Sequence, residues 1–496
     1  MSSISFLPEV ENFFRNEPQH MFIGGKWVLP IKGGFFETHD PGTGEVLTLV
    51  SAGDSSDINL AVEAARNAFK SSGWATMSAQ ERAAILNKLA DLIDQNLEIL
   101  VQIESLDVGK PAAHARAFDI PNVAQSFRYY ADLSVQSHRK EPIAVKGFEA
   151  HTVRSPYGVC GFIIPWNFPF LLIGWNLAPA LAAGNTVVLK PAEDTPLSSL
   201  YFARLAEQAG VPAGVINVVT GFGQTAGASL AQHTDINRMA FTGSPEVGRR
   251  IAASCGKNLV PCKLELGGKG AAVVFEDVNI DATAKALVDA VTLNAGQVCC
   301  TATRWMIHEK VWEAFVDKSR SYMQSVKIGH GQNPETQMGP LVSSKQKLRV
   351  LDYLKKGVEQ GAKVLLEGGS FDVSGYPNGH FVKPALLSGK IDNICAREEI
   401  FGPVAFLIPF KDEMEASAAV NSSSYGLANS VWTKDLQRAQ RVGEALVSGN
   451  SWINAHNLFA HGIPYGGCNL SGCGGGVLGP ETYFDYLRPQ SVVRAL

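Results

Sequence analysis

The chain has 496 residues and a formal net charge of −4, with 43 Lys and Arg against 47 Asp and Glu. This balance argues against the strongly basic face of a nucleic-acid-binding protein and against a polybasic membrane anchor. Charged residues make up 18% of the chain and hydrophobic residues 46%, a composition that argues against disorder and predicts a large buried core. Glycine is over-represented at 48 residues, and many of these glycines follow predicted strands.

Targeting signals and metal-ligand patterns are not evident. Residues 1–20 lack the basic segment and apolar stretch of a signal peptide. The most apolar long segment, residues 168–184, contains Pro169, Asn176 and Pro179, which we expect to break a helix there, so that it would span a membrane poorly. The eight cysteines form no CxxC pair and no zinc-ligand spacing, so we expect reduced thiols, a cytoplasmic setting and no bound metal.

The N-terminal third of the chain is predicted to be helical and to end in a hairpin. Helical patterning covers residues 58–110, where Ser78 and Glu81 form a capping box before apolar residues at helical spacing. Residues 143–153 have the pattern of a β-hairpin. The last residues, 491–496, are predicted to form a short strand that could pair with this hairpin.

Between these ends, β-rich runs alternate with helical stretches. The first set has predicted strands at residues 159–164, 186–189, 215–220 and 238–241, with helices at 197–209 and 223–232. The second set has predicted strands at residues 271–275, 303–308, 364–366 and 404–410, with helices at 281–295, 313–325 and 347–360. Such alternation predicts an α/β fold with parallel sheets covered on both faces.

Three segments after predicted strands have residues suited to a nucleotide. Residues 241–248 form a small-residue turn that opens a helix, where backbone N–H groups can hold a phosphate. Residues 190–193 combine a lysine and a carboxylate that can contact ribose hydroxyls, and residues 399–403 combine an acid with an aromatic ring. Each segment alone also fits a plain turn or a solvated loop.

Residues suited to nucleophilic catalysis also occur. Cys299 and Cys300 follow a helical stretch, Glu265 lies in an apolar, glycine-rich stretch, and Asn167 lies just before a proline. A nucleophilic thiol needs a base and oxyanion donors, which Glu265 and Asn167 could supply. Taken singly, each residue also fits a structural role, as a core cysteine, a paired acid or a turn residue.

Taken together and in order, these segments resemble the NAD(P)-dependent aldehyde dehydrogenase superfamily over nearly the whole chain. The nearest branches are the non-acylating betaine and amino-aldehyde enzymes and phenylacetaldehyde-like enzymes. The strongest matches are residues 165–169, 190–193, 241–244, 265–269, 296–299 and 398–403. The resemblance implies an α/β fold with three parts: a Rossmann-like NAD-binding domain (residues 1–133 and 154–267), an α/β catalytic domain (268–468) and a β-hairpin oligomerisation element (134–153 and 482–496). It also implies a homodimer or homotetramer.

The resemblance implies roles for individual residues. Cys299 is the implied nucleophile, Asn167 the implied oxyanion donor, and Glu265 the implied base that activates water. The residues implied to bind the cofactor are Ile164, Pro165, Trp166, Lys190, Glu193, Phe241, Gly243, Ser244, Leu266, Gly267, Glu399 and Phe401. A carboxylate at Glu193 would repel a 2′-phosphate, so NAD is favoured over NADP.

The implied substrate is a small aldehyde. The residues implied to line its pocket are Phe168, Leu172, Trp175, Asp119, Asn122, Cys300, Phe459 and Tyr465. Their apolar character favours an uncharged aliphatic or aromatic aldehyde. One alternative is a betaine or amino-aldehyde dehydrogenase, although Asn122 stands where such enzymes have a second acidic residue. Another is a CoA-acylating semialdehyde dehydrogenase, although the presence of Glu265 argues against it. A third is a non-catalytic scaffold on the same fold.

The chain departs from the family at several positions. Asn176 stands where many relatives have lysine, Asn469 also departs from the usual motif, and an acid that serves some members as a proton relay is absent near residues 479–480. Gly475 and Gly476 replace a customary Arg-Glu pair, within a run of glycines over residues 472–476. These departures leave the proton route and some subunit contacts open, and the sequence offers no explanation for the glycine run.

Overall fold

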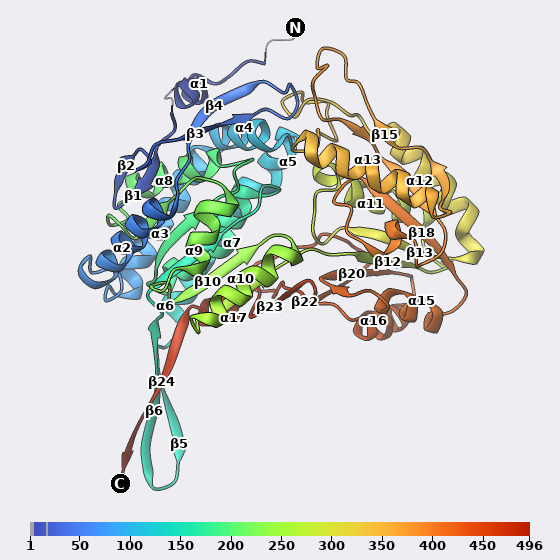
Figure 1. The fold of residues 1–496 in the computed structure, drawn as a ribbon. Coiled ribbons are helices and arrows are strands. Elements are labelled where there is room, and N and C mark those ends of the chain that lie inside the picture. The colour runs from blue at the N-terminus through green and yellow to red at the C-terminus, as the bar shows by residue number, and fades with distance from the viewer. Residues whose placement is uncertain (1–3, 16–17) are drawn as a thin grey trace.

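The computed structural model describes residues 4–15 and 18–496, so residues 1–3 and 16–17 of the segment searched for a signal peptide lie outside the described residues. Figure 1 shows two lobes side by side and a long β-arm that projects from the first lobe. The C-terminus lies near the tip of this arm, whereas helix α1 (Pro8–Arg15) lies at the opposite end of the molecule.

The first lobe is built on an eight-stranded sheet with the order β2-β1-β9-β8-β7-β10-β11-β23. Strands β9, β8, β7, β10 and β11 run parallel, and the strands at both edges are antiparallel to their neighbours. The bounds are β1 (Met21–Ile23), β2 (Lys26–Val28), β7 (Val159–Ile163), β8 (Thr186–Lys190), β9 (Ile216–Val218), β10 (Arg238–Thr242), β11 (Cys262–Glu265) and β23 (Gly472–Cys473). The predicted parallel sheet is therefore confirmed.

The helices of this lobe are α1 (Pro8–Arg15), α2 (Ser55–Ser71), α3 (Ala79–Gln95), α4 (Leu97–Val108), α6 (Ile120–Gln136), α7 (Pro169–Ala182), α8 (Leu197–Ala209), α9 (Ala228–Gln232) and α10 (Pro245–Lys257). The predicted helical region 58–110 is divided into α2, α3 and α4. The predicted capping box is confirmed, since the Glu81 N–H donates to Ser78 Oγ at 3.2 Å and the Ser78 N–H donates to Glu81 Oε2 at 3.0 Å.

The expected break in the apolar segment 168–184 is wrong. Helix α7 is continuous even though Pro179 lies inside it. Pro169 lies in its first turn, where a missing N–H costs no hydrogen bond, and Asn176 Nδ2 donates within the helix to the Leu172 carbonyl at 2.9 Å. All of α7 is buried in the first lobe. Among the described residues, no helix has the length and apolarity needed to span a bilayer.

The second lobe is built on a seven-stranded sheet with the order β14-β17-β18-β13-β12-β20-β21, in which only β14 is antiparallel to its neighbour. The bounds of the strands are β12 (Gly270–Val274), β13 (Ala302–His308), β14 (Lys363–Leu366), β17 (Ala385–Ser388), β18 (Val404–Phe410), β20 (Ala428–Trp432) and β21 (Asn450–Ile453). The helices include α11 (Ile280–Thr292), α12 (Trp312–Ser325), α13 (Ser344–Glu359), α15 (Glu413–Asn421) and α16 (Leu436–Ala445).

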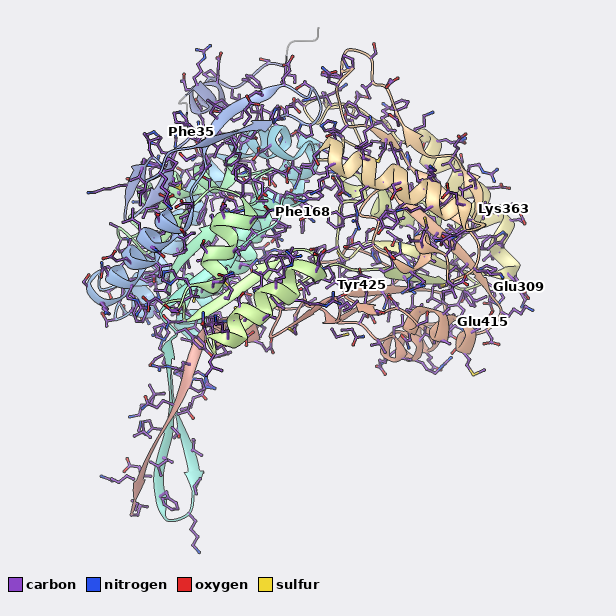
Figure 2. The ribbon with its side chains drawn as sticks, viewed as in Figure 1. Phe35, Phe168, Glu309, Lys363, Glu415 and Tyr425 are labelled. Carbon is purple, nitrogen blue, oxygen red and sulfur yellow. The ribbon has the colours of Figure 1, made fainter. Side chains whose placement is uncertain are left out.

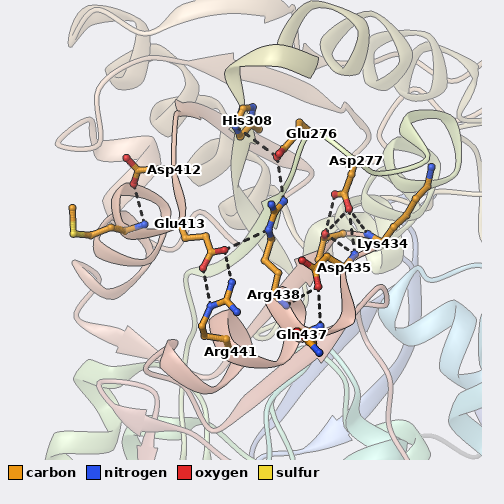
Figure 3. Close-up of polar contacts among 12 residues, drawn as sticks. Glu276, Asp277, His308, Asp412, Glu413, Lys434, Asp435, Gln437, Arg438 and Arg441 are labelled. Atoms are coloured by element: carbon orange, nitrogen blue, oxygen red, sulfur yellow. Dashed lines mark hydrogen bonds and ion pairs between the residues drawn. The ribbon is translucent and has the colours of Figure 1, made fainter.

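Ionic contacts hold α15 and α16 to the end of β12 (Figure 3). Arg438 of α16 pairs with Glu276 at 3.3 Å and with Glu413 of α15 at 3.4 Å. Asp277 accepts hydrogen bonds from Thr433 Oγ1 at 2.8 Å and from the Lys434 N–H at 2.9 Å. These contacts fix the outer helices of the second lobe away from the space between the lobes.

The arm is a three-stranded antiparallel sheet of β24 (Leu487–Ala495), β6 (Phe148–Pro156) and β5 (Lys140–Val145). The predicted hairpin is confirmed, as is its pairing with the terminal strand, which is longer than the predicted residues 491–496. Strand β5 is exposed along its whole length, and β24 is exposed except at Leu487. The arm therefore presents two long strands to solvent in the isolated chain.

Candidate active site

A cavity of about 840 Å³ is lined by residues of both lobes. Parallel strands β7, β8, β10 and β11 all direct their carboxyl ends toward it, as expected of a ligand site in an α/β sheet. Figure 2 labels Phe168, which lines the cavity, on the side of the first lobe that faces the second. The cavity is the place where most of the predicted site residues meet.

All predicted site residues line this cavity except Ile164, Lys190, Phe241 and Asn122. These four are buried behind its wall. Lys190 Nζ donates to Glu193 Oε2 at 2.9 Å, and Asn122 Oδ1 accepts from Trp175 Nε1 at 2.7 Å. Lys190 and Asn122 therefore orient residues that face the cavity and do not themselves face it.

The turn that presents Cys299 begins earlier than the sequence predicts. The helix expected over residues 281–295 ends at Thr292, and Asn294 and Ala295 follow in the left-handed region, with φ of 47° and 54°. Asn294 Nδ2 donates to the Asn167 carbonyl at 2.9 Å, which holds the turn against the first lobe. The strained turn exposes part of Cys299, whereas Cys300 is only 2% exposed.

The two neighbouring thiols have different surroundings. Cys299 Sγ lies 3.7 Å from the Tyr465 hydroxyl, and Cys300 Sγ donates to Asn457 Oδ1 at 3.4 Å. A hydrogen bond with Cys300, together with burial, raises the pKa of Cys299 well above its usual value. Both thiols line the cavity, but Cys299 is the more exposed of the two, and it needs help to ionise.

An amide group lines the same cavity as this thiol. Asn167 is buried and lines the cavity, and one N–H of its side chain donates to the Gln297 carbonyl at 3.0 Å. Because an asparagine amide has two N–H groups, the second can donate to an oxyanion formed on a substrate at Cys299.

The carboxyl group of Glu265 lies at the end of β11 and is 6% exposed. Its Oε1 atom has no hydrogen-bond partner among the described residues. Burial raises the pKa of Glu265 well above its usual value, whereas the positive charge of Lys263, which points to the same face of β11, acts in the opposite direction. A carboxyl group with these properties can accept a proton near neutral pH.

Further residues of the cavity are suited to a dinucleotide. Glu193 and Ser244 line the cavity, and Ser244 caps α10, whose first turn leaves N–H groups free for phosphate. Glu399 Oε1 accepts from the Gly268 N–H at 2.8 Å, and burial raises the pKa of Glu399 to about 7. Phe401 adopts a left-handed φ of 61°, and Gln346 Nε2 donates to its carbonyl at 2.7 Å.

Several cavity residues were missed by sequence reasoning, because they lie outside the recognised motifs. They include Lys110, His114, Asn176, Asp194, Lys345, Gln346, Arg349 and Asn457. Arg349 Nη2 donates to the Glu399 carbonyl at 2.7 Å, so it supports the segment that holds Glu399. Of these residues, only Asn457 could have been found from the sequence, because it lies two positions before Phe459, which was already expected to line the pocket.

The unexplained glycine run, residues 472–476, allows a close approach of backbone. A Cβ at Gly474 would lie 2.0 Å from the Cys262 carbonyl oxygen, and a Cβ at Gly476 would lie 2.3 Å from that of Tyr465. The run therefore lets the chain pass between β11 and the segment that carries Tyr465. Side chains there would push Tyr465 out of the cavity wall.

A parallel sheet whose strand ends meet a thiol, an amide and a buried carboxyl group in one cavity is typical of a nucleotide-dependent oxidoreductase. Comparison with known protein families identifies the family within this class. Residues 27–492 match the aldehyde dehydrogenase family, and the chain belongs to that family.

Relatives across the family cover nearly the whole chain. A mitochondrial aldehyde dehydrogenase of Arabidopsis thaliana, family 2 member B4, is 42% identical over 96% of this chain and 88% of its own. A mitochondrial benzaldehyde dehydrogenase of Antirrhinum majus is 40% identical over 96% and 89%. The structure of an aldehyde dehydrogenase from Bacillus cereus in complex with NAD+ superposes with a TM-score of 0.96 at 41% identity, covering 100% of both chains.

Proposed function

We propose that this protein oxidises uncharged aliphatic or aromatic aldehydes to carboxylic acids with NAD as the oxidant. The observation that carries the proposal is that Cys299, Asn167 and Glu265 line one cavity, which continues to Glu193 and Ser244. A thiol, an amide donor and a base are what thioester chemistry requires, and Glu193 and Ser244 in the same cavity are suited to a dinucleotide.

Other residues of the cavity fit NAD. Glu193 would accept from the adenosine ribose, the first turn of α10 at Ser244 would hold the pyrophosphate, and Glu399 and Phe401 would hold the nicotinamide ribose and ring. A Cβ at Gly267 would lie 2.3 Å from Glu399 Oε2, so the close approach of these segments depends on that glycine. When bound, NAD supplies the hydride acceptor. The carboxylate of Glu193 disfavours the 2′-phosphate of NADP.

The chain's own residues supply the remaining steps. The Cys299 thiolate attacks the aldehyde carbon, and the Asn167 side chain and the Cys299 backbone N–H stabilise the oxyanion of the thiohemiacetal. Loss of hydride leaves a thioester on Cys299. Glu265 then removes a proton from water, which attacks the thioester and releases the acid and the thiol.

An ion pair in the pocket wall supports an uncharged substrate. Lys110 Nζ lies 2.6 Å from Asp119 Oδ2 and 3.0 Å from Glu104 Oε1, and it also sits 4.2 Å from the centre of the Phe168 ring. Asp119 is thus held by Lys110, whose single positive charge it shares with Glu104, and the Asn122 amide oxygen already accepts from Trp175. Neither of the side chains considered for a cationic tail is free to bind one, which argues against betaine and amino-aldehydes.

The arm exposes strands that a further copy of the chain can pair with. The exposed strands β5 and β24 support a homodimer or homotetramer in which the arm is the oligomerisation element, residues 134–153 and 482–496. Residues 1–133 and 154–267 then form the NAD-binding domain, and 268–468 the catalytic domain. We infer a cytoplasmic setting from the composition alone.

The experiment is a panel of short aliphatic, aromatic, amino and betaine aldehydes, assayed by absorbance of reduced nicotinamide with NAD and with NADP. We expect free acid as product, with the highest kcat/KM for uncharged aldehydes and NAD. A preference for betaine or amino-aldehydes would overturn the substrate assignment. Acyl-CoA as the product would support the acylating alternative, and inactivity of the pure enzyme with the whole panel would support a scaffold.

A further inference from the structure

Tyr465, expected from the resemblance only to line the substrate pocket, has its hydroxyl oxygen 3.7 Å from Cys299 Sγ. The residue is held firmly in this place. Its backbone exchanges two hydrogen bonds with Val477, at 2.9 and 2.7 Å, and its ring packs on Trp175 and Phe459 with centroid distances of 5.8 and 5.3 Å. The hydroxyl therefore cannot move far from the thiol without disturbing the wall.

Of the groups around the Cys299 sulfur, one is well suited to donate a hydrogen bond to the thiolate. Among the described residues, the side chains that hydrogen-bond its sulfur are the Tyr465 hydroxyl and the Cys300 thiol. A thiolate can only accept, and a phenol O–H is a stronger donor than a thiol S–H. The Cys300 thiol, moreover, already donates to Asn457 Oδ1.

Ionisation of Cys299 in this site is costly without such a donor. Hydrogen bonding with Cys300 and burial raise the pKa of the Cys299 thiol, while the hydrogen bond with Tyr465 lowers it. The groups that face Tyr465 are Cys299, Cys300 and Glu265. Burial, their negative charge and a hydrogen bond with Cys300 raise the pKa of the tyrosine, so it stays a protonated donor.

We propose that Tyr465 is a catalytic residue whose hydroxyl donates a hydrogen bond to the Cys299 thiolate and so activates the nucleophile. The inference rests on the proposed function, in which Cys299 attacks the aldehyde. When the S–H bond breaks, its electron pair stays on sulfur and the proton forms an O–H bond on the Glu265 carboxylate, which later loses it to water. Tyr465 keeps its own proton throughout.

The test is the pH dependence of alkylation of Cys299 by iodoacetamide, followed by mass spectrometry of the labelled peptide, in the free enzyme. Tyr465→Phe keeps the ring and removes only the hydroxyl. Because a hydrogen bond to a charged group is worth one to two pKa units, we expect the alkylation pKa to rise by about that much and the rate at neutral pH to fall about 10- to 100-fold.

A matched control is Tyr130→Phe, which also removes a buried tyrosine hydroxyl, here one that donates to the Gly479 carbonyl at 3.2 Å. It should leave the alkylation profile unchanged. In the aldehyde assay, Tyr465→Phe should slow the first-turnover burst by a similar factor with little change in KM, because the aromatic wall is retained.

The outcomes separate this inference from the proposed function. An alkylation profile identical to wild type in a Tyr465→Phe enzyme that still oxidises aldehydes would show that Tyr465 is only part of the wall. If the wild-type protein oxidised none of the aldehydes while Tyr465→Phe still shifted the alkylation profile, the proposed function would be wrong and the role of Tyr465 toward Cys299 would stand. Equal thermal midpoints of the two proteins exclude misfolding as the cause of any change.

Discussion

Gly268 lies directly against the carbonyl group of Cys299, so closely that a Cβ at Gly268 would lie 2.0 Å from that oxygen. The backbone that carries the thiol is therefore supported by a position that tolerates no side chain. Gly268→Ala should displace Cys299 and lower kcat by at least about tenfold, since small displacements of reacting groups have large effects.

The control for this substitution is Gly256→Ala, in α10, where an added Cβ meets no atom within 4 Å. This variant should be as active as wild type and slightly more stable, because alanine favours a helix over glycine. The prediction fails if both variants have wild-type steady-state rates.

Glu265→Gln keeps the size of the side chain and removes its basicity. We expect a burst of reduced nicotinamide equal to about one turnover, followed by almost no steady-state rate, because the thioester on Cys299 is no longer hydrolysed. Stopped-flow absorbance measures both phases. A steady-state rate equal to that of wild type would exclude Glu265 as the deacylation base.

Lys263→Met should alter the pH profile of the same step. The positive charge of Lys263 favours ionised Glu265, so its loss raises the pKa of Glu265 further. The hydrolysis step needs the carboxylate, and the acidic limb of the steady-state rate should therefore move to higher pH. Since burial lowers the pKa of Lys263 to about 8, the difference from wild type should shrink above that pH.

Lys263→Arg retains the positive charge and is the control for this experiment. Its acidic limb should stay near that of wild type. If Lys263→Met and Lys263→Arg gave the same profile, the charge of Lys263 would have no influence on the base.

Lys110→Met should destabilise the fold. Lys110 is 1% exposed, and its removal leaves Glu104 and Asp119 buried without a counter-charge, which costs about 3–5 kcal/mol. Thermal unfolding should show a clear drop in the midpoint. Lys285→Met, which breaks the exposed pair with Asp289, should leave the midpoint unchanged, and equal midpoints for the two variants would contradict the prediction.

Glu193→Gln should relax the preference for NAD. The amide can still accept from a ribose hydroxyl but no longer repels a 2′-phosphate, so the ratio of kcat/KM for NADP to that for NAD should rise about tenfold or more. The exposed Glu313, on α12, provides a control: Glu313→Gln should leave the ratio unchanged. A ratio unaffected by Glu193→Gln would mean that this carboxylate does not select the cofactor.

Local features of the chain were readable without the structure. The capping box of Ser78 and Glu81 depends on residues three apart, and β7 and β8 are runs of apolar residues because both faces of a central parallel strand are covered. The motifs after these strands were readable for a related reason. Parallel strands direct their carboxyl ends to one edge, so residues far apart in the chain meet there.

Features that depend on contacts between distant segments were not readable. The left-handed turn at Asn294 and Ala295 is held by a hydrogen bond to Asn167, and nothing in the local sequence signals the end of the helix at Thr292. The ion pair of Lys110 and Asp119 joins residues only nine apart, but it was not readable either, because both side chains become buried partners only once the surrounding segments pack.

The glycines mark the boundary between the two kinds of information. Their abundance, and their tendency to follow strands, was evident from the chain alone. Why Gly268 and the run at residues 472–476 must lack side chains became clear only when Cys299, Cys262 and Tyr465 were seen against them. Composition and periodicity report what each segment prefers, whereas a close approach of two backbones, or of a hydroxyl and a thiol, exists only once the chain has packed.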